Sequence, residues 1–201
     1  HQYGISVSNA GDVNGDGFDD IVIGTYPFEI YNAHNVGAYV YFGSVSGINS
    51  TDPSWTASNS SPGQNFGKIV STAGDVNNDG FDDVIVSDFS SAKVFAYYGS
   101  ANKGMFEIEN WSAYVQGANN YVSSISDAGD VNGDGYGDII ISKMDYQYLG
   151  YTSIIVFNGS NSGLSLIPNQ ELQGNGYQNF ISISKAGDFN NDGYSDIVVG
   201  E

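Results

Sequence analysis

Cysteine and arginine are both absent from this chain of 201 residues, and basic side chains of any kind are scarce. Without cysteine, neither disulfides nor thiol chemistry can operate, and the sequence gives no information on the redox compartment. Without arginine, no guanidinium group can hold a phosphate or carboxylate through paired hydrogen bonds. Five lysines against 23 acidic residues give a formal net charge of −18, which disfavours nucleic acid as a partner.

Long apolar segments and catalytic residue patterns are missing as well. The chain contains no apolar run of about 18 residues, so the sequence predicts no membrane span. The two histidines are His1 and His34, and none of the many serines lies in a nucleophile motif. We therefore predict that the protein is not an enzyme.

The chain does contain one loop of nine residues in four near-copies. The copies span Asp12–Asp20, Asp75–Asp83, Asp130–Asp138 and Asp188–Asp196, and they recur every 55 to 63 residues. Each copy follows an Ala-Gly pair and precedes a short run of Ile and Val. A loop repeated at this period indicates a repeat protein built around a common site.

Oxygen-bearing side chains occupy positions 1, 3, 5 and 9 of every copy, so a tight turn can direct them to one centre. Calcium takes about six to eight oxygen ligands in proteins, and the carbonyl of position 7 is a natural additional one. Position 6 is always Gly and position 4 is Gly or Asn, residues that tolerate positive φ. With one Ca²⁺ per loop, the predicted ligands are Asp12, Asn14, Asp16, Phe18, Asp20, Asp75, Asn77, Asp79, Phe81, Asp83, Asp130, Asn132, Asp134, Tyr136, Asp138, Asp188, Asn190, Asp192, Tyr194 and Asp196.

Two other interpretations of the loop compete with this one. An EF-hand needs an acid at position 12, where the chain has Ile23, Val86, Ile141 and Val199, and the β-branched runs predict strands rather than helices. Asp, Asn and Gly are also plain turn formers, so one copy alone would indicate a turn. Four copies that agree at positions 1, 3, 5, 6 and 9 favour calcium. Outside the loops little net charge remains, which places the acidity at the predicted sites.

The segments around the loops predict an all-β fold with four short strands per repeat. We divide the chain into repeats 1–62, 63–118, 119–175 and 176–201, the last of which stops after its second strand. A four-stranded unit repeated at this period indicates a β-propeller blade, so about 3.5 blades of an incomplete ring are expected, with the first strand of each blade innermost. The predicted strands are 3–10, 20–25, 37–43, 51–58, 66–73, 83–88, 92–98, 108–113, 121–128, 138–143, 151–158 and 168–173.

The segment from Tyr3 to Gly24 resembles the FG-GAP repeat of integrin α-subunit propellers and of many secreted microbial proteins. The resemblance extends over essentially the whole chain, although the Phe-Gly pair stands as Tyr3-Gly4 and Phe66-Gly67 and is replaced in the later repeats. It implies a propeller rigidified by Ca²⁺ that acts outside the cell or at its surface in adhesion or recognition. The alternative is a non-catalytic or substrate-binding propeller domain of a secreted carbohydrate-active or surface-layer protein.

Two long aromatic loops, at 25–34 and 143–151, are expected on the rim opposite the calcium loops. Rigid tyrosine rings suit protein or glycan ligands, whereas packing of these rings against blade edges is the alternative. Since closed propellers have about four to eight blades, we also expect the rest of a longer chain or another subunit at the open blade edge. The predicted ligand-binding residues are Tyr26, Tyr31, Tyr146, Tyr148 and Tyr151.

Overall fold

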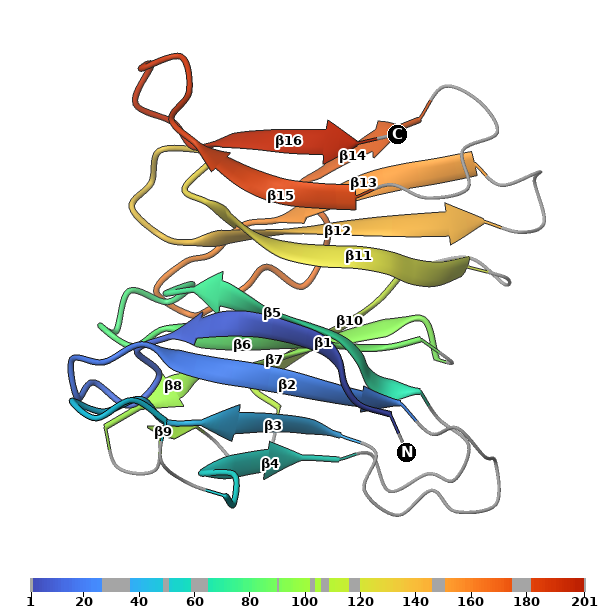
Figure 1. Ribbon diagram of the computed structural model, residues 1–201. Helices are drawn as coiled ribbons and strands as arrows, with labels where there is room; N and C mark the ends of the chain where they lie inside the picture. The colour runs from blue at the N-terminus through green and yellow to red at the C-terminus, as the bar shows by residue number, and fades with distance from the viewer. Residues whose placement is uncertain are drawn as a thin grey trace.

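The computed structural model describes residues 2–26, 37–48, 51–58, 65–89, 91–101, 104–105, 109–115, 120–145, 151–174 and 182–200. All regular structure in these segments is β, and it forms three four-stranded antiparallel sheets and two two-stranded ones. The three four-stranded sheets and the last two-stranded sheet follow one another along the chain (Figure 1), and the other two-stranded sheet is inserted within the second of them. This arrangement confirms the predicted all-β fold of propeller blades that do not close a ring.

Each blade is a meander in which neighbouring strands in sequence pair in space. Blade 1 consists of β1 (Gln2–Gly11), β2 (Asp20–Tyr26), β3 (Ala38–Tyr41) and β4 (Trp55–Ala57). Blade 2 consists of β5 (Phe66–Gly74), β6 (Asp83–Asp88), β7 (Lys93–Tyr97) and β10 (Trp111–Tyr114). Blade 3 consists of β11 (Asn120–Gly129), β12 (Asp138–Asp145), β13 (Tyr151–Phe157) and β14 (Gln170–Gln173). The half-blade that follows contains β15 (Ser182–Gly187) and β16 (Asp196–Gly200).

The structure differs from the predicted strands at the outer edges of the blades. The outermost strand of blade 1 covers Trp55–Ala57 rather than 51–58, because it pairs with a neighbour on one side only. A small hairpin, β8 (Gly99–Ser100) and β9 (Gly104–Met105), was not predicted. It packs its Met105 side chain into the core between blades 1 and 2.

The first strands of the blades lie side by side along the inner edge of the fold, as β1, β5, β11 and β15 do in Figure 1. Polar side chains join them. The backbone N–H of Val70 in β5 donates to the Ser6 hydroxyl in β1 at 3.1 Å. The small residues Ala10, Ala73 and Ala128 of these strands are fully buried, which permits the close approach.

The core lies between blades, not within them. Trp55 of β4 packs edge-on against Tyr97 of the next blade, with ring centroids 4.8 Å apart. One blade further on, Trp111 of β10 packs in the same way against Phe157 at 5.0 Å. The central strands β6 and β12 are apolar on both faces because a neighbouring blade covers each face. Each blade is therefore completed by its neighbours.

Candidate metal centre

The four nine-residue loops join the first and second strands of their blades and lie on the same side of the molecule, at the left in Figure 1. A shift in strand register precedes each loop, at the Gly of the Ala-Gly pair. That glycine has φ between 68° and 74° in all four copies. The bulge turns the chain out of the sheet, so that the loop begins with its position-1 aspartate at the same place in each blade.

The position-1 carboxylate is the centre of each loop. One of its oxygens accepts the N–H of position 5 at 3.0–3.1 Å, and the other accepts the N–H of position 6 at 2.8–3.0 Å. The position-3 side-chain oxygen accepts the same position-5 N–H at 2.8–3.1 Å. The oxygens of positions 1 and 3 therefore converge on one backbone amide in every copy.

Positive φ angles at positions 4 and 6 make this wrapping possible. The position-6 glycines have φ between 87° and 91°, a region that is costly for residues with a Cβ. Position 4 has φ of 73° and 76° where it is Gly, and 55° and 60° where it is Asn78 or Asn191. The residue types at both positions thus follow from the backbone that the loop requires.

The position-9 aspartate ties the loop to the rest of its blade. In the three complete blades this side chain is fully buried, and its Oδ2 accepts the N–H of position 2 at 2.9–3.1 Å. Its Oδ1 accepts the N–H of a glycine beyond the third strand, at 2.8 Å for Gly43 and 2.9 Å for Gly99 and Gly159. Loop and third strand are therefore fixed to each other through one carboxylate.

Burial makes a negative charge at position 9 unfavourable. The pKa of Asp20 is raised to about 6 and that of Asp83 to about 8, mainly by loss of solvation and to a smaller extent by the carboxylates at positions 5 and 1, while the backbone N–H groups that each side chain accepts act in the opposite direction. The same causes raise the pKa of Asp138 to about 6. A cation beside these carboxylates would favour their ionised form.

The donor set of each loop consists of oxygen atoms only, from three carboxylates, one amide and one backbone carbonyl, and this is the chemistry of a hard cation such as Ca²⁺. The described residues include no group of three or more acidic or histidine side chains arranged to hold a metal ion. Instead, the loop carboxylates face backbone amides. A carboxylate oxygen can accept a hydrogen bond and still offer a further lone pair, so the residues present fit the ion chemically.

Residues 3–42 match the FG-GAP repeat model, and residues 75–141 match the FG-GAP-like repeat model, together more than half of the chain. The chain belongs to the FG-GAP repeat family. It is 31% identical to integrin alpha-PS5 of Drosophila melanogaster over 69% of its own length and 15% of that protein. It is 30% identical to integrin alpha-8 of Mus musculus over 98% of its own length and 19% of that protein. The chain thus spans less than a fifth of these relatives.

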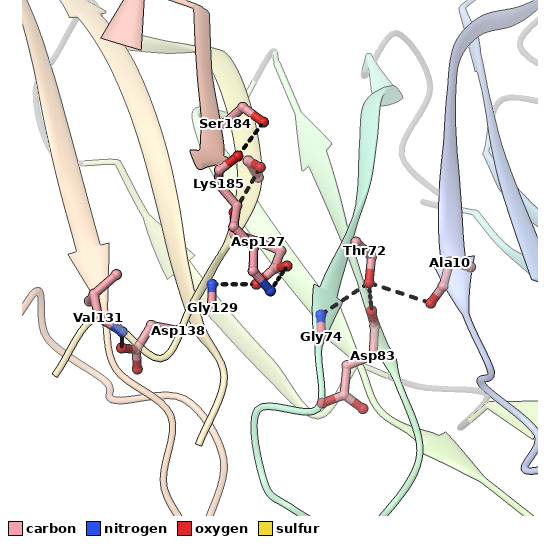
Figure 2. A network of polar contacts seen from close by, with 11 residues as sticks. Ala10, Thr72, Gly74, Asp83, Asp127, Gly129, Val131, Asp138, Ser184 and Lys185 are labelled. Atoms are coloured by element: carbon pink, nitrogen blue, oxygen red, sulfur yellow. Dashed lines mark hydrogen bonds and ion pairs between the residues drawn. The ribbon is translucent and has the colours of Figure 1, made fainter. Parts of the chain in front are cut away.

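A cavity of about 430 Å³ lies where the FG-GAP repeats meet at the inner edge, and it was not predicted from the sequence. Equivalent residues three positions before each loop line it, namely Asn9, Thr72, Asp127 and Lys185. Figure 2 shows Lys185 reaching across to Asp127, with Nζ and Oδ2 3.1 Å apart. Asp127 also accepts the N–H of Gly129, and Thr72 accepts that of Gly74, so both support the bulge before the loop.

Only the alignment of repeats could have revealed these lining residues. They share one register position but differ in chemistry, being an amide, a hydroxyl, a carboxylate and an ammonium group. A search for a recurring residue type therefore passes over them.

The predicted ligand surface falls outside the described side chains. Tyr26 and Tyr151 lie in β2 and β13, but their side chains are not described, and Tyr31, Tyr146 and Tyr148 lie outside the described residues. The tyrosine surface of this FG-GAP protein remains a prediction. No helix in the described part of the chain has the length and apolar character needed to cross a membrane.

Proposed function

We propose that each of the four FG-GAP loops binds one Ca²⁺ and that the rigidified blades serve as a non-catalytic adhesion or recognition module outside the cell or at its surface. The observation that carries this proposal is the repetition of one hydrogen-bond pattern, which orients the same candidate oxygen ligands in all four loops. The residues that would hold the ion are those at positions 1, 3, 5, 7 and 9 of each loop.

The residues of the chain prepare this site through backbone amides. The N–H groups of positions 5 and 6 orient the position-1 carboxylate, and the N–H of position 7 orients the position-5 carboxylate at 3.0–3.1 Å. Three carboxylates in one loop repel one another, and in the three complete blades the position-9 carboxylate is buried as well. Calcium supplies the positive charge that offsets both costs, which couples ion binding to folding.

The similarity to integrin α-subunits supports a role in recognition. For this chain, we propose a protein or glycan ligand on the rim opposite the calcium loops, contacted by Tyr26, Tyr31, Tyr146, Tyr148 and Tyr151. Extracellular calcium modules commonly have dissociation constants of about 10⁻⁴–10⁻³ M, and we expect the same range here. The rest of a longer chain or another subunit would cover the open blade edge.

The calcium proposal is tested by calorimetric titration of EDTA-stripped protein. We expect four Ca²⁺ ions per chain, and Asp79→Asn should reduce the number by one because it removes a proposed ligand charge while preserving the shape of the side chain. Absence of calcium binding at millimolar concentration would overturn the proposal.

The recognition proposal needs a second experiment, a glycan and surface-protein binding array probed with and without a chelator. We expect one ligand class to be retained in calcium and lost in EDTA. Release of reducing ends from a polysaccharide would instead support a carbohydrate-active enzyme.

A further inference from the structure

Successive calcium loops are joined to each other by main-chain hydrogen bonds. The N–H of position 8 in one loop donates to the carbonyl oxygen of position 1 in the preceding loop. The distance is 3.1 Å from Asp82 to Asp12, 3.0 Å from Gly137 to Asp75, and 2.8 Å from Ser195 to Asp130. The contact recurs at all three junctions between the four loops, so it belongs to the repeat and not to one blade.

The first junction carries additional contacts. The backbone N–H of Asp12 donates to the Asp82 carboxylate at 2.9 Å, so Asp82 holds the first residue of the preceding loop by both its backbone and its side chain. Position 8 is Gly137 and Ser195 at the other two junctions, neither of which has a carboxylate. A ring contact is shared by the first and third junctions, since the aromatic ring of Phe81 covers Gly15 and that of Tyr194 covers Gly133.

A single peptide group connects each pair of loops. The carbonyl of position 7 is the proposed calcium ligand, and the N–H of position 8 belongs to the same peptide unit. No described peptide bond is cis, so this carbonyl and this N–H point in opposite directions. An ion on the carbonyl side polarises the peptide and strengthens the N–H as a donor to the preceding loop.

We propose that the four loops form one coupled row, in which an ion in one loop raises the calcium affinity of its immediate neighbours. This inference rests on the calcium binding proposed above. Because binding linkage is reciprocal, a loop that is supported by the next one supports it equally in return. The coupling is strongest between the first and second loops, where Asp82 adds its side chain, and loops that are not neighbours are linked only indirectly, through the occupancy of the loop between them.

Calcium titration of protein labelled with ¹⁵N-glycine tests the coupling loop by loop. The position-6 glycines Gly17, Gly80, Gly135 and Gly193 each donate to the position-1 carboxylate of their own loop, so each amide signal reports one site. In Asp79→Asn, we expect the Gly80 signal to lose its calcium response. The midpoints of Gly17 and Gly135 should rise at least about fivefold, the lower end of typical couplings, with the larger change at Gly17. The Gly193 midpoint should rise by less than that of Gly135, because the substitution reaches the fourth loop only through the lower occupancy of the third.

Asp192→Asn is the matched variant at the other end of the row. It should raise the midpoint of Gly135 most, that of Gly80 less and that of Gly17 least, because the last two loops are reached only through the loops between. Asp192→Asn also tests the coupling if Asp79→Asn fails to fold, because the last loop lies in the half-blade, whose side chains are largely exposed.

The contribution of Asp82 is tested by Asp82→Ala, alone and combined with Asp79→Asn. Coupling between the first two loops should fall to the value found between the second and third. Asp19→Ala is the control, since Asp19 has the same position in the first loop but, among the described residues, its carboxylate accepts a hydrogen bond from Asn9 of its own blade, at 3.3 Å, and not from another loop. It should leave every coupling unchanged.

The outcomes separate the two proposals. If no glycine amide responds to calcium, the proposed function fails. If all four respond but Asp79→Asn leaves the Gly17 and Gly135 midpoints unchanged, the coupling is wrong while calcium binding stands. Lower midpoints would mean that repulsion between neighbouring ions dominates, which also overturns the coupling.

Discussion

Blade 3 and the half-blade after it share one sequence pattern but differ in burial. Ile140 and Ile141 of β12 are fully buried, whereas their register equivalents Val198 and Val199 of β16 are 53% and 37% exposed. The loops differ in the same way. Val131, at position 2 of the third loop, is partly buried against the core, but Phe189 at position 2 of the fourth loop is 88% exposed. The apolar run of a blade thus becomes core only where a following blade covers it.

The outermost strands of the blades show the same dependence of burial on a following blade. Trp55 and Trp111 are the register equivalents of Gln170, since all three are paired to the same position of the third strand of their blade. The two tryptophans are buried against the following blade, whereas Gln170 is exposed. We expect the stability of each blade to depend on the blade that follows it.

Removal of calcium should lower the stability of the blades more than any of the substitutions below. At a free concentration of about ten times the dissociation constant, each ion stabilises the fold by about 1.4 kcal/mol, or about 6 kcal/mol for four. For a chain of this size, that corresponds to a melting temperature lower by about 12–24 °C in EDTA. Calorimetric melting with and without calcium measures it, and identical curves would contradict it.

The next largest effect is expected from Trp111→Ala. This side chain fills the interface of blades 2 and 3, and its Nε1–H donates to the Ser165 carbonyl at 2.8 Å. We expect a loss of about 3–5 kcal/mol in the free energy of unfolding, measured in urea. Gln170→Ala is the matched control and should change this free energy by less than about 0.5 kcal/mol. Equal losses would break the comparison between covered and uncovered blades.

A smaller contrast uses the same substitution at two equivalent strand positions. Val86→Ala removes two buried methyl groups between blades 1 and 2 and should cost about 2 kcal/mol. Val199→Ala, at the corresponding place in β16, should cost less than about 0.5 kcal/mol. The measurement is again urea unfolding. If the Val199 loss approaches that of Val86 in a longer chain, a further blade or partner covers β16 there.

The smallest effect distinguishes two glycines of the first loop. Both have positive φ, at 73° for Gly15 and 87° for Gly17, so alanine is strained at either position. Gly15 alone lies under the Phe81 ring of the next blade, while an added Cβ at Gly17 meets nothing within 4 Å. Gly15→Ala should therefore be the more destabilising by about 1 kcal/mol, as judged by unfolding in EDTA. A reversed order would show that the ring moves aside freely.

The repeat, the blades and the loop residues could be predicted because their signals are local. Positions 4 and 6 need particular backbone angles, and the β-branched run after each loop favours a strand over a short window. The roles of Asp82 and Thr72 could not be predicted, because their partners Asp12 and Ala10 lie 70 and 62 residues away. The β8–β9 hairpin was missed for the same reason. Gly104 lies against the Phe42 ring of blade 1, a contact that no local window contains.

The contact between Asp12 and Asp82 also sets an order of events during synthesis. The first loop is complete only when a residue 70 positions later has left the ribosome. At about 5–20 residues per second, the nascent first blade waits roughly 4–14 seconds for this partner. Throughout that interval its apolar face is exposed, so a slow translation step within blade 2 would lengthen the period in which the new chain needs a chaperone.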